Sequence, residues 1–339
     1  MKKVFLTLVA ATVAATMSFA QSSMLATLSH DGEISTYYGA LALRDAYAQA
    51  ASGDIITLSS GSFNAVDIDK GITIRGAGMS INASEQTEPT ILTGAFSINI
   101  PDEDANRLTI EGIYHNATVT MVNFKNGTFL KDRFRTLTYS SKEESRCTNL
   151  SMIHCKVAEA LHLPSNSPIS CINCFINFPA NDATSAIEFV NCIIRQGDSR
   201  NFRDGLFACS FKNCIFDCCL YGSDYLKGDD NHTVYYCLAN NSPKVLFQNV
   251  ANTTNVYKDN CSEIFKTYNT TYTDNENFEL LDEIKESIKG LDGTEVGIYG
   301  GNMPFSTTPT NPQITKCNVA AKSTADGKLS VDITVNGAE

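Results

Sequence analysis

Several features are missing from this chain of 339 residues, and each absence excludes a class of protein. The chain contains no tryptophan, so a bound sugar would have to stack on tyrosine or be held by polar contacts. It carries a formal charge of −11 without any block of Lys and Arg, which argues against nucleic acid and anionic membrane surfaces as partners. It also lacks a nucleophile elbow, a phosphate-binding loop and a His-rich metal motif, so we expect no cofactor.

Only one long apolar run is present, and it lies at the N-terminus. Met1-Lys2-Lys3 precedes an uncharged apolar segment from Val4 to Thr16, and Ser18-Phe19-Ala20 has the small residues of a cleavage site. The run is too short to span a bilayer comfortably and no second run follows, so no membrane insertion is expected. Residues 1–20 are predicted to be the signal peptide of an exported protein that is secreted, periplasmic or on the cell surface.

One phrase returns through the middle of the chain: an apolar pair, a turn-former, Cys, any residue, and an apolar residue. Five copies align at intervals of 19, 18, 22 and 23 residues, on Cys155, Cys174, Cys192, Cys214 and Cys237. Helical repeats are longer and have a 3.6-residue period, whereas these copies are short β-branched and aromatic segments broken by Asn, Gly, Ser and Asp. The predicted fold is therefore all-β, a parallel β-helix solenoid with about ten coils between Ile55 and Cys261.

The repeat also predicts how its corners are built. Asn173, Asn191 and Asn213 are expected at equivalent corners in the left-handed conformation, with each amide bonded to the Asn above and below. The Cys that follows each corner then points inward, where cysteines on adjacent coils lie ~4.8 Å apart with parallel Cβ vectors, too far apart for a disulfide. Cys155, Cys174, Cys192, Cys214 and Cys237 are thus predicted to be a stack of buried thiols.

The other cysteines leave more than one possibility. Cys171 and Cys174 have the spacing of zinc ligands, but no second pair completes the site, and we expect no metal. The sequence leaves open the disulfide state of Cys171, Cys209, Cys218, Cys219, Cys261 and Cys317.

The segments Gly53-Asp54-Ile55-Ile56-Thr57-Leu58 and Ile72-Thr73-Ile74-Arg75-Gly76-Ala77-Gly78, followed by the Asn-Cys coils, resemble the pectate-lyase-like superfamily of right-handed parallel β-helices over roughly residues 36–302. With Asp292-Gly293-Thr294-Glu295-Val296-Gly297-Ile298-Tyr299-Gly300-Gly301, the chain more closely resembles a group of secreted bacterial proteins. The resemblance implies the right-handed fold strongly. It also suggests two activities to consider, that of a lyase that needs Ca²⁺ and that of a hydrolase that uses clustered Asp.

The ends of the solenoid need caps. An apolar stripe at helical spacing, formed by Ala40, Leu43, Tyr47 and Ala50, predicts a helix that covers the N-terminal end. Residues 21–302 would then hold the β-helix and its caps, 303–312 a Pro-rich linker, and 313–339 a C-terminal tail. In that tail Leu329, Val331, Ile333 and Val335 alternate strictly, which predicts a β-hairpin, either laid against the rod or offering a free edge to a partner strand.

Basic side chains are the first candidates for contact with a glycan. Lys131, Arg133 and Arg135 alternate, so on a strand all three would leave one face and could hold the carboxylates of an acidic glycan, or simply be solvated. A second mixed cluster, expected in a long loop, contains Arg195, Arg200 and Arg203 as further candidates, although mutual salt bridges with neighbouring Asp would also explain it.

The run Gly228-Asp229-Asp230-Asn231-His232 resembles the Gly-Asp-Asp of galacturonan hydrolases, so Asp229, Asp230 and His232 form a candidate acidic site. The partner motifs of that family are missing, and such a run is also an ordinary turn. The leading interpretation is an exported β-helix that binds a polysaccharide or another extracellular surface without chemistry. The alternatives are a lyase or glycoside hydrolase acting on an acidic glycan, with Ca²⁺ only for the lyase, and a structural or adhesive partner protein that uses its hairpin. The oligomeric state is left open.

Overall fold

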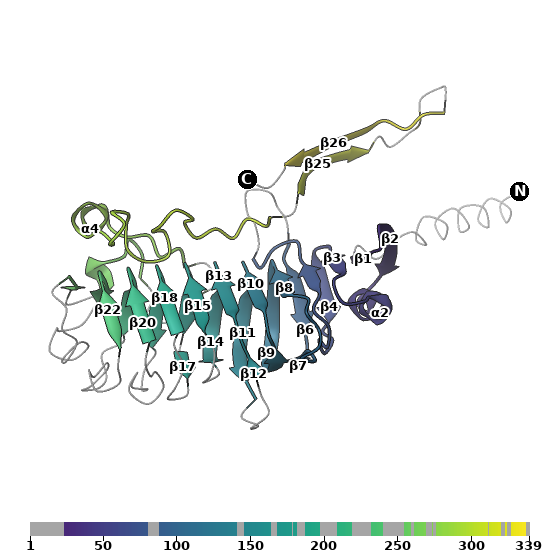
Figure 1. The fold of residues 1–339 in the computed structure, drawn as a ribbon. Helices are drawn as coiled ribbons and strands as arrows, with labels where there is room; N and C mark the ends of the chain where they lie inside the picture. Colours follow the sequence, from purple (N-terminus) through teal and green to yellow (C-terminus); the bar gives the residue numbers. More distant parts are fainter. Residues whose placement is uncertain are drawn as a thin grey trace, which may run out of the picture.

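The computed structural model describes residues 24–80, 88–140, 146–163, 168–177, 179–181, 187–196, 209–218, 232–239, 254–258, 261–268, 273, 276–310, 312–319, 323 and 327–336. Their strands stack side by side into a rod, with the chain advancing along it from one end to the other (Figure 1). The predicted signal peptide lies outside the described residues.

Sheet A has eleven strands, and all pairs after the first two are parallel. In spatial order these are β2 (Glu33–Tyr38), β1 (Leu25–His30), β3 (Ile55–Leu58), β5 (Thr73–Arg75), β8 (Leu108–Glu111), β10 (Gly127–Leu130), β13 (Leu150–Ile153), β15 (Ile169–Ile172), β18 (Ile187–Val190), β20 (Cys209–Lys212) and β22 (Thr233–Tyr235).

Sheet B has thirteen strands, ten of them in one parallel ladder. The ladder runs through β4 (Gly61–Asn64), β6 (Thr90–Thr93), β9 (Ile113–Phe124), β11 (Arg133–Tyr139), β14 (Lys156–Leu163), β16 (Phe175–Asn177), β19 (Ile193–Gln196), β21 (Ile215–Cys218), β23 (Leu238–Ala239) and β24 (Val256–Tyr257). Three short strands lie off this path, β7 (Phe96–Asn99) and β12 (Arg146–Cys147) beside β9, and β17 (Pro179–Asn181) beside β14.

The parallel β-helix is the predicted fold, but the expected number of about ten coils was too high. The regular part has about six turns. In sheet A, each of six successive pairings advances the chain by 18 to 23 residues between Thr109 and Thr233. The turn before it, from Thr73 to Thr109, takes 36 residues. The predicted number was too high because the regular repeat length was also applied to this part of the chain, where one longer turn contains β7 and an additional loop.

Alternating burial explains why these short segments form strands. Leu150 and Met152 of β13 are buried while Ser151 and Ile153 are half-buried, and β15, β18 and β20 follow the same period of two. The inward residues of both sheets form one continuous apolar core along the rod.

The corner between sheet A and sheet B is left-handed, as the Asn-Cys phrase predicts. Lys131, His154, Asn173, Asn191, Asn213 and Tyr236 occupy it on successive turns, with φ between 50° and 55°. The hydrogen bonds of the corner amides differ from the prediction. Asn173 Nδ2 donates to the carbonyl oxygens of Ile298 and Gly300, both at 2.8 Å, and Asn213 Oδ1 accepts from the N–H of Leu291. These bonds attach a returning C-terminal segment rather than the Asn of the next coil.

That returning segment, residues 276–310, is named the strap. It includes α4 (Asp282–Ser287), and the short 3₁₀ helix η3 (Cys261–Glu263) precedes it. Apolar strap residues such as Phe278, Ile284 and Ile298 pack against the outward row of sheet B made by Phe175, Ile193, Ile215 and Leu238. Residues 303–310 also contact the rod, because Lys131 Nζ donates to Thr308 O and His154 Nε2 bonds to Met303 O. Most of the expected Pro-rich linker is therefore a packed part of the strap.

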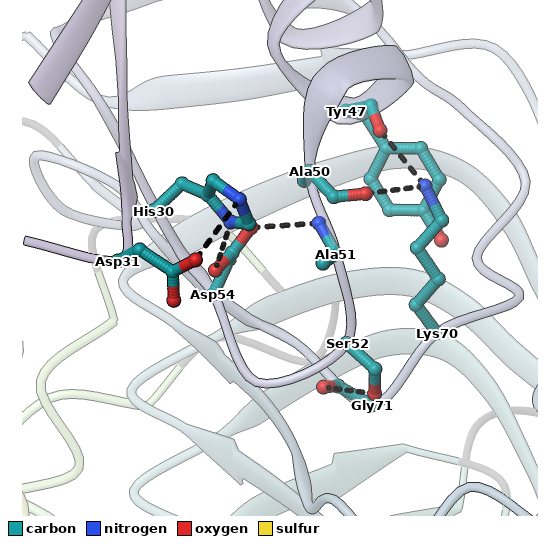
Figure 2. A network of polar contacts seen from close by, with 9 residues as sticks. All are labelled: His30, Asp31, Tyr47, Ala50, Ala51, Ser52, Asp54, Lys70 and Gly71. Carbon is teal, nitrogen blue, oxygen red and sulfur yellow. Dashed lines mark hydrogen bonds and ion pairs between the residues drawn. The ribbon is translucent and has the colours of Figure 1, made fainter. Parts of the chain in front are cut away.

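A helix and a hairpin cover the N-terminal end. α2 (Ala42–Gln49) buries Ala42, Leu43, Ala46 and Tyr47, as expected for a capping helix. Lys70 Nζ donates to the carbonyl oxygens of Tyr47 and Ala50 at the end of α2 (Figure 2). The β1–β2 hairpin, which the sequence did not predict, lies beside β3, where Asp54 Oδ2 accepts from Ala51 N–H and both Asp54 oxygens contact His30 Nδ1.

The predicted C-terminal hairpin is formed by β25 (Gln313–Val319) and β26 (Val331–Asn336), which pair antiparallel. It stands away from the rod in Figure 1. The described residues from Gly327 to Val335 are exposed, so the expectation of a hairpin laid against the rod was wrong.

Candidate functional site

One outward row of sheet B changes its chemistry along the rod. The residues in register at this row are Tyr114, Arg133, Lys156, Phe175, Ile193, Ile215 and Leu238, on β9, β11, β14, β16, β19, β21 and β23. The strap covers the four apolar members. Over the three polar members it leaves a hollow of about 780 Å³, which we name the strap groove.

The strap groove has a floor and two walls. Tyr114, Arg133 and Lys156 form the floor, beside Ile91 of β6. The remaining lining residues are Met79, Ser80, Glu88 and Pro89 on one side, and Glu276, Asn277, Tyr299, Phe305, Ser306, Thr307 and Thr308 of the strap on the other.

The cations on the floor are held by aromatic rings. The Arg133 guanidinium carbon lies 4.0 Å from the ring centroid of Tyr114, and Lys156 Nζ lies 5.5 Å from that of Phe305. Arg133 and Lys156 are directly paired in register, so their Cα atoms are one strand spacing apart, ~4.8 Å. The site therefore places two positive charges side by side with aromatic surface next to each.

The strap wall is tied down at both ends of its last segment. The bond from Lys131 Nζ to Thr308 O measures 2.7 Å and that between His154 Nε2 and Met303 O 2.9 Å. Burial lowers the pKa of His154 and also that of Lys131. Tyr299 donates from its hydroxyl to Asn277 O, and burial raises its pKa to about 12.

The basic stripe predicted at Lys131, Arg133 and Arg135 is not one strand face. Lys131 is a corner residue before β11, so its side chain serves the strap. Arg135 is exposed and pairs with Glu159 at 2.8 Å. Of the three, Arg133 alone lines the strap groove.

Arg195 was expected in a loop, but it lies on β19 and its side chain is only 2% exposed. Its Nε contacts Asp217 Oδ2 at 2.6 Å, and its two terminal nitrogens meet both oxygens of Glu276 at 3.1 and 2.9 Å. Asp217 also accepts from the Tyr268 hydroxyl. These bonds fix the strap to sheet B, and they leave Arg195 too buried to touch a glycan. Arg200 and Arg203 lie outside the described residues.

The candidate acidic site has one described member. His232 is buried, and its Nδ1 accepts from the N–H of Cys209 at 3.1 Å, which uses the ring to support the β20 strand. Asp229 and Asp230 lie outside the described residues.

The five repeat cysteines lie at the predicted inward position and are buried. The cysteines whose side chains are described are all free thiols: Cys147, Cys155, Cys171, Cys174, Cys192, Cys209, Cys214 and Cys237. The side chains of Cys218, Cys219, Cys261 and Cys317 lie outside the description. Within the described chain, no group of three His, Cys, Asp or Glu side chains is placed to hold a metal ion.

The first turn before the thiol stack has a carboxylate instead of a thiol. Asp132 takes the inward position that Cys155 occupies one turn later, and it accepts from the N–H of Ile113 at 2.9 Å. His115 Nε2 lies 3.7 Å from Asp132 Oδ1, and the His115 ring stacks on Phe134 with centroids 4.5 Å apart. Burial raises the pKa of Asp132.

A second, smaller hollow of about 530 Å³ follows the outer face of sheet A. Hydroxyl side chains line it on neighbouring strands, at Ser151, Ser170 and Ser210. Among its described lining residues Arg107, whose Nη1 donates to Thr128 Oγ1, is the one cation and Glu188 the one anion. None of these described residues is aromatic, in contrast to the strap groove.

Sequence reasoning missed Tyr114, Lys156, Tyr299 and Phe305. A signal for Lys156 was present in the repeat itself. The residue after the inward Cys is apolar in the later turns, as in Phe175, Ile193 and Ile215, but charged in Cys155-Lys156 and Asp132-Arg133. A charged residue at a repeat position that is otherwise apolar indicates where the strap stops covering the row.

Comparisons with known proteins add no assignment. No family model, no curated protein and no solved structure matches the chain. No helix in the described part of the chain is long and apolar enough to cross a membrane.

Proposed function

We propose that this protein binds an acidic polysaccharide in the strap groove, without cleaving it. The observation that carries the proposal is the adjacent placement of Arg133 and Lys156 on the groove floor. A carboxylate or sulfate that enters the groove would be attracted by both charges, and it would contact the half-buried Arg133 first, because Lys156 is buried. A guanidinium also matches the two oxygens of a carboxylate with two parallel hydrogen bonds.

The remaining lining suits a sugar chain. Tyr114, Tyr299 and Phe305 offer ring faces against which the apolar side of a pyranose can lie, which compensates for the missing tryptophan. Glu88, Asn277 and Ser306 offer polar atoms to sugar hydroxyls.

Affinity electrophoresis and calorimetry against acidic and neutral polysaccharides test the proposal. We expect retardation by an acidic polymer such as polygalacturonate, and a loss of at least about tenfold in affinity in Arg133→Met, because a hydrogen bond to a charged group contributes ~1.5–3 kcal/mol. Arg135→Met is the matched control, since it removes the same charge two residues along β11 but outside the groove. Equal losses in the two variants, or no retardation by any acidic polymer, would refute the site.

The same incubations test the enzymatic alternative. If chain shortening or the ultraviolet signal of unsaturated sugar ends appears, and more strongly so with Ca²⁺, the protein is a lyase and the binding proposal gives way. The membership of the pectate-lyase-like superfamily, the right-handed sense of the helix and export through residues 1–20 are parts of this proposal that rest on sequence. The parallel β-solenoid is the coarser fold that such a superfamily requires, and it does not bear on export, for which N-terminal sequencing of exported protein would test cleavage before Gln21.

A further inference from the structure

The corner row that holds the strap changes its chemistry beside the strap groove. Where the strap covers the apolar part of sheet B, Asn173 and Asn213 bond its backbone with neutral amides. Beside the groove the same corner row has His154 and Lys131, whose side-chain nitrogens bond strap carbonyl oxygens at 2.9 and 2.7 Å. The strap wall of the groove is therefore attached to the corner row through side chains that can change their charge.

His154 contacts the groove through an aromatic ring of the strap. Its Nε2 donates to Met303 O, and its ring centroid lies 5.9 Å from that of Phe305. Phe305 lines the groove, and Lys156 Nζ on the groove floor lies 5.5 Å from the centroid of the same ring. His154 thus supports the ring that borders the cations of the floor.

The second ring nitrogen of His154 decides which charge state fits the attached strap. Nδ1 is buried and has no hydrogen-bond partner among the described residues. Because Nε2 carries the hydrogen that Met303 O accepts, Nδ1 has no proton in the neutral ring. Protonation of Nδ1 would bury a positive charge and an N–H group without an acceptor, and both are unfavourable.

The surroundings of the ring also disfavour the positive form. Burial lowers the pKa of His154 from its ordinary value of 6.5, and the charge of Lys131 on the preceding corner lowers it further. The bond to Met303 and the thiol of Cys174 act in the other direction and offset part of this effect. Since the attached strap favours the neutral ring, attachment weakens as the pH falls below 6.5.

Other ionisable groups lie close to the same part of the strap. Glu111 accepts a hydrogen bond from the strap backbone, and burial raises its pKa, so its titration acts in the opposite direction. Lys156 is a cation of the groove floor, and Glu88 and Glu276 are the carboxylates among the described lining residues. All these groups are unchanged in a variant of His154, so comparison with such a variant isolates the contribution of this ring.

We propose that His154 is a positioning residue that makes the strap wall sensitive to pH, because its neutral ring holds residues 302–310 against the rod and its protonation releases them. Residues up to Gly300 stay attached, since Asn173 bonds Ile298 and Gly300 through an amide that does not titrate. Release moves Phe305 away from the groove, so affinity for the glycan falls in mild acid. That consequence rests on the proposed function, whereas the release itself does not.

Hydrogen exchange of the full chain without ligand, from about pH 5 to 8, measures the release. His154→Gln places an N–H donor near the position of Nε2 and cannot be protonated. His154→Asn is the second variant, because Asn occupies the three following corners with the same backbone conformation. The measured quantity is the ratio of wild-type to variant exchange at the same pH, in which the intrinsic pH dependence of exchange cancels.

The expected result is that this ratio, for residues 303–310, rises at least about threefold between pH 8 and 5 with both variants. A variant that holds the strap less well changes the ratio equally at every pH, so it does not imitate this rise. Unchanged exchange in β10 and β13 shows that the rod is intact. A ratio that stays constant, or that falls in acid, would overturn the inference.

Binding of dextran sulfate, followed by calorimetry over the same range, tests the consequence for the groove, because its sulfates stay ionised throughout. Affinity of the wild type relative to His154→Gln should fall at least about threefold from pH 8 to 5. A relative gain in acid would show that the added charge outweighs the loss of the wall, and would overturn this effect on binding. If dextran sulfate binds at no pH, the proposed function fails, while exchange still decides whether His154 releases the strap.

Discussion

Lys156 is paired in register with Arg133, so the two cations of the strap groove stand on neighbouring strands β14 and β11. In the next turns the equivalent positions are Phe175 and Ile193, both buried under the strap. The same row of the β-helix thus serves two purposes. Where it is apolar it attaches the strap, and where it is charged it borders an open groove.

The first prediction concerns how the corners hold the strap. Asn173→Gly keeps the left-handed backbone but removes both bonds from Nδ2 to Ile298 and Gly300, and we expect it to lower the free energy of unfolding by about 1–3 kcal/mol. Asn173→Ala should cost roughly 1–2 kcal/mol more, because φ is 50° at this corner. Urea unfolding of both variants checks this. If the Gly variant is as stable as the wild type, the strap is not held by this amide.

A second prediction concerns the buried ion pairs of Arg195. Arg195→Met leaves Asp217 and Glu276 buried without their cation, which should lower the free energy of unfolding by about 3–5 kcal/mol. Arg135→Met removes an exposed pair with Glu159 and should cost less than about 1 kcal/mol. Thermal or urea unfolding compares the two. Similar costs would contradict the burial of the Arg195 network.

The third prediction concerns the pH dependence of the free energy of unfolding that the buried Asp132 causes. Burial raises the pKa of Asp132 above its ordinary value of 3.8, so the folded state holds this proton more tightly than the unfolded state. The stability that the proton contributes is present at low pH and is lost as the pH rises through the raised pKa. Asp132→Asn keeps an oxygen for the N–H of Ile113 and cannot ionise.

The expected result is that Asp132→Asn gains stability relative to the wild type as the pH rises from about 4 to 7. Urea unfolding at a series of pH values measures the difference. A constant difference across that range would show that Asp132 does not titrate as a buried group.

The fourth prediction has the same sign but concerns a basic group, in the N-terminal hairpin. The hydrogen bond and charge of Asp54, with a further contribution from Asp31, raise the pKa of His30 above its ordinary value of 6.5 (Figure 2). The stability from this pair is fully present below pH 6.5 and is lost as the pH rises through the raised pKa. The wild type should therefore exceed His30→Gln in stability most strongly at low pH, in the same pH series. An advantage that grows with pH would contradict the pair.

The sequence predicts local features of this fold well and long-range ones poorly. The Asn-Cys phrase predicts the left-handed corners and the inward thiols, because both follow from the backbone of a single turn. It does not predict that Asn173 bonds to a strap 125 residues away, since nothing in the local pattern encodes that partner. Arg195 was placed in a loop for the same reason: its partner Glu276 comes 81 residues later and buries it.

The candidate site depends on that same long-range arrangement. Arg133 was identified by its charge, and Lys131 was grouped with it because the corner before β11 was taken as strand. Arg135 does lie on β11, but the strand pairing is irregular between Phe134 and Thr136, and Arg135 pairs with Glu159 instead of lining the groove. Tyr299 and Phe305 belong to the strap, so their place beside Tyr114 was not visible in the sequence. The charged repeat position at Lys156 was the one local sign of the groove.

Hydrogen exchange, measured with and without an acidic oligosaccharide that the protein retains, tests the central claim most directly. If the strap groove is the binding site, exchange should slow in the strap from Tyr299 to Thr308 and in β11 and β14. The hollow on sheet A, lined by Ser151 and Ser170, serves as an internal reference and should not change. Protection confined to sheet A, or no protection of the strap at saturating oligosaccharide, would contradict the account.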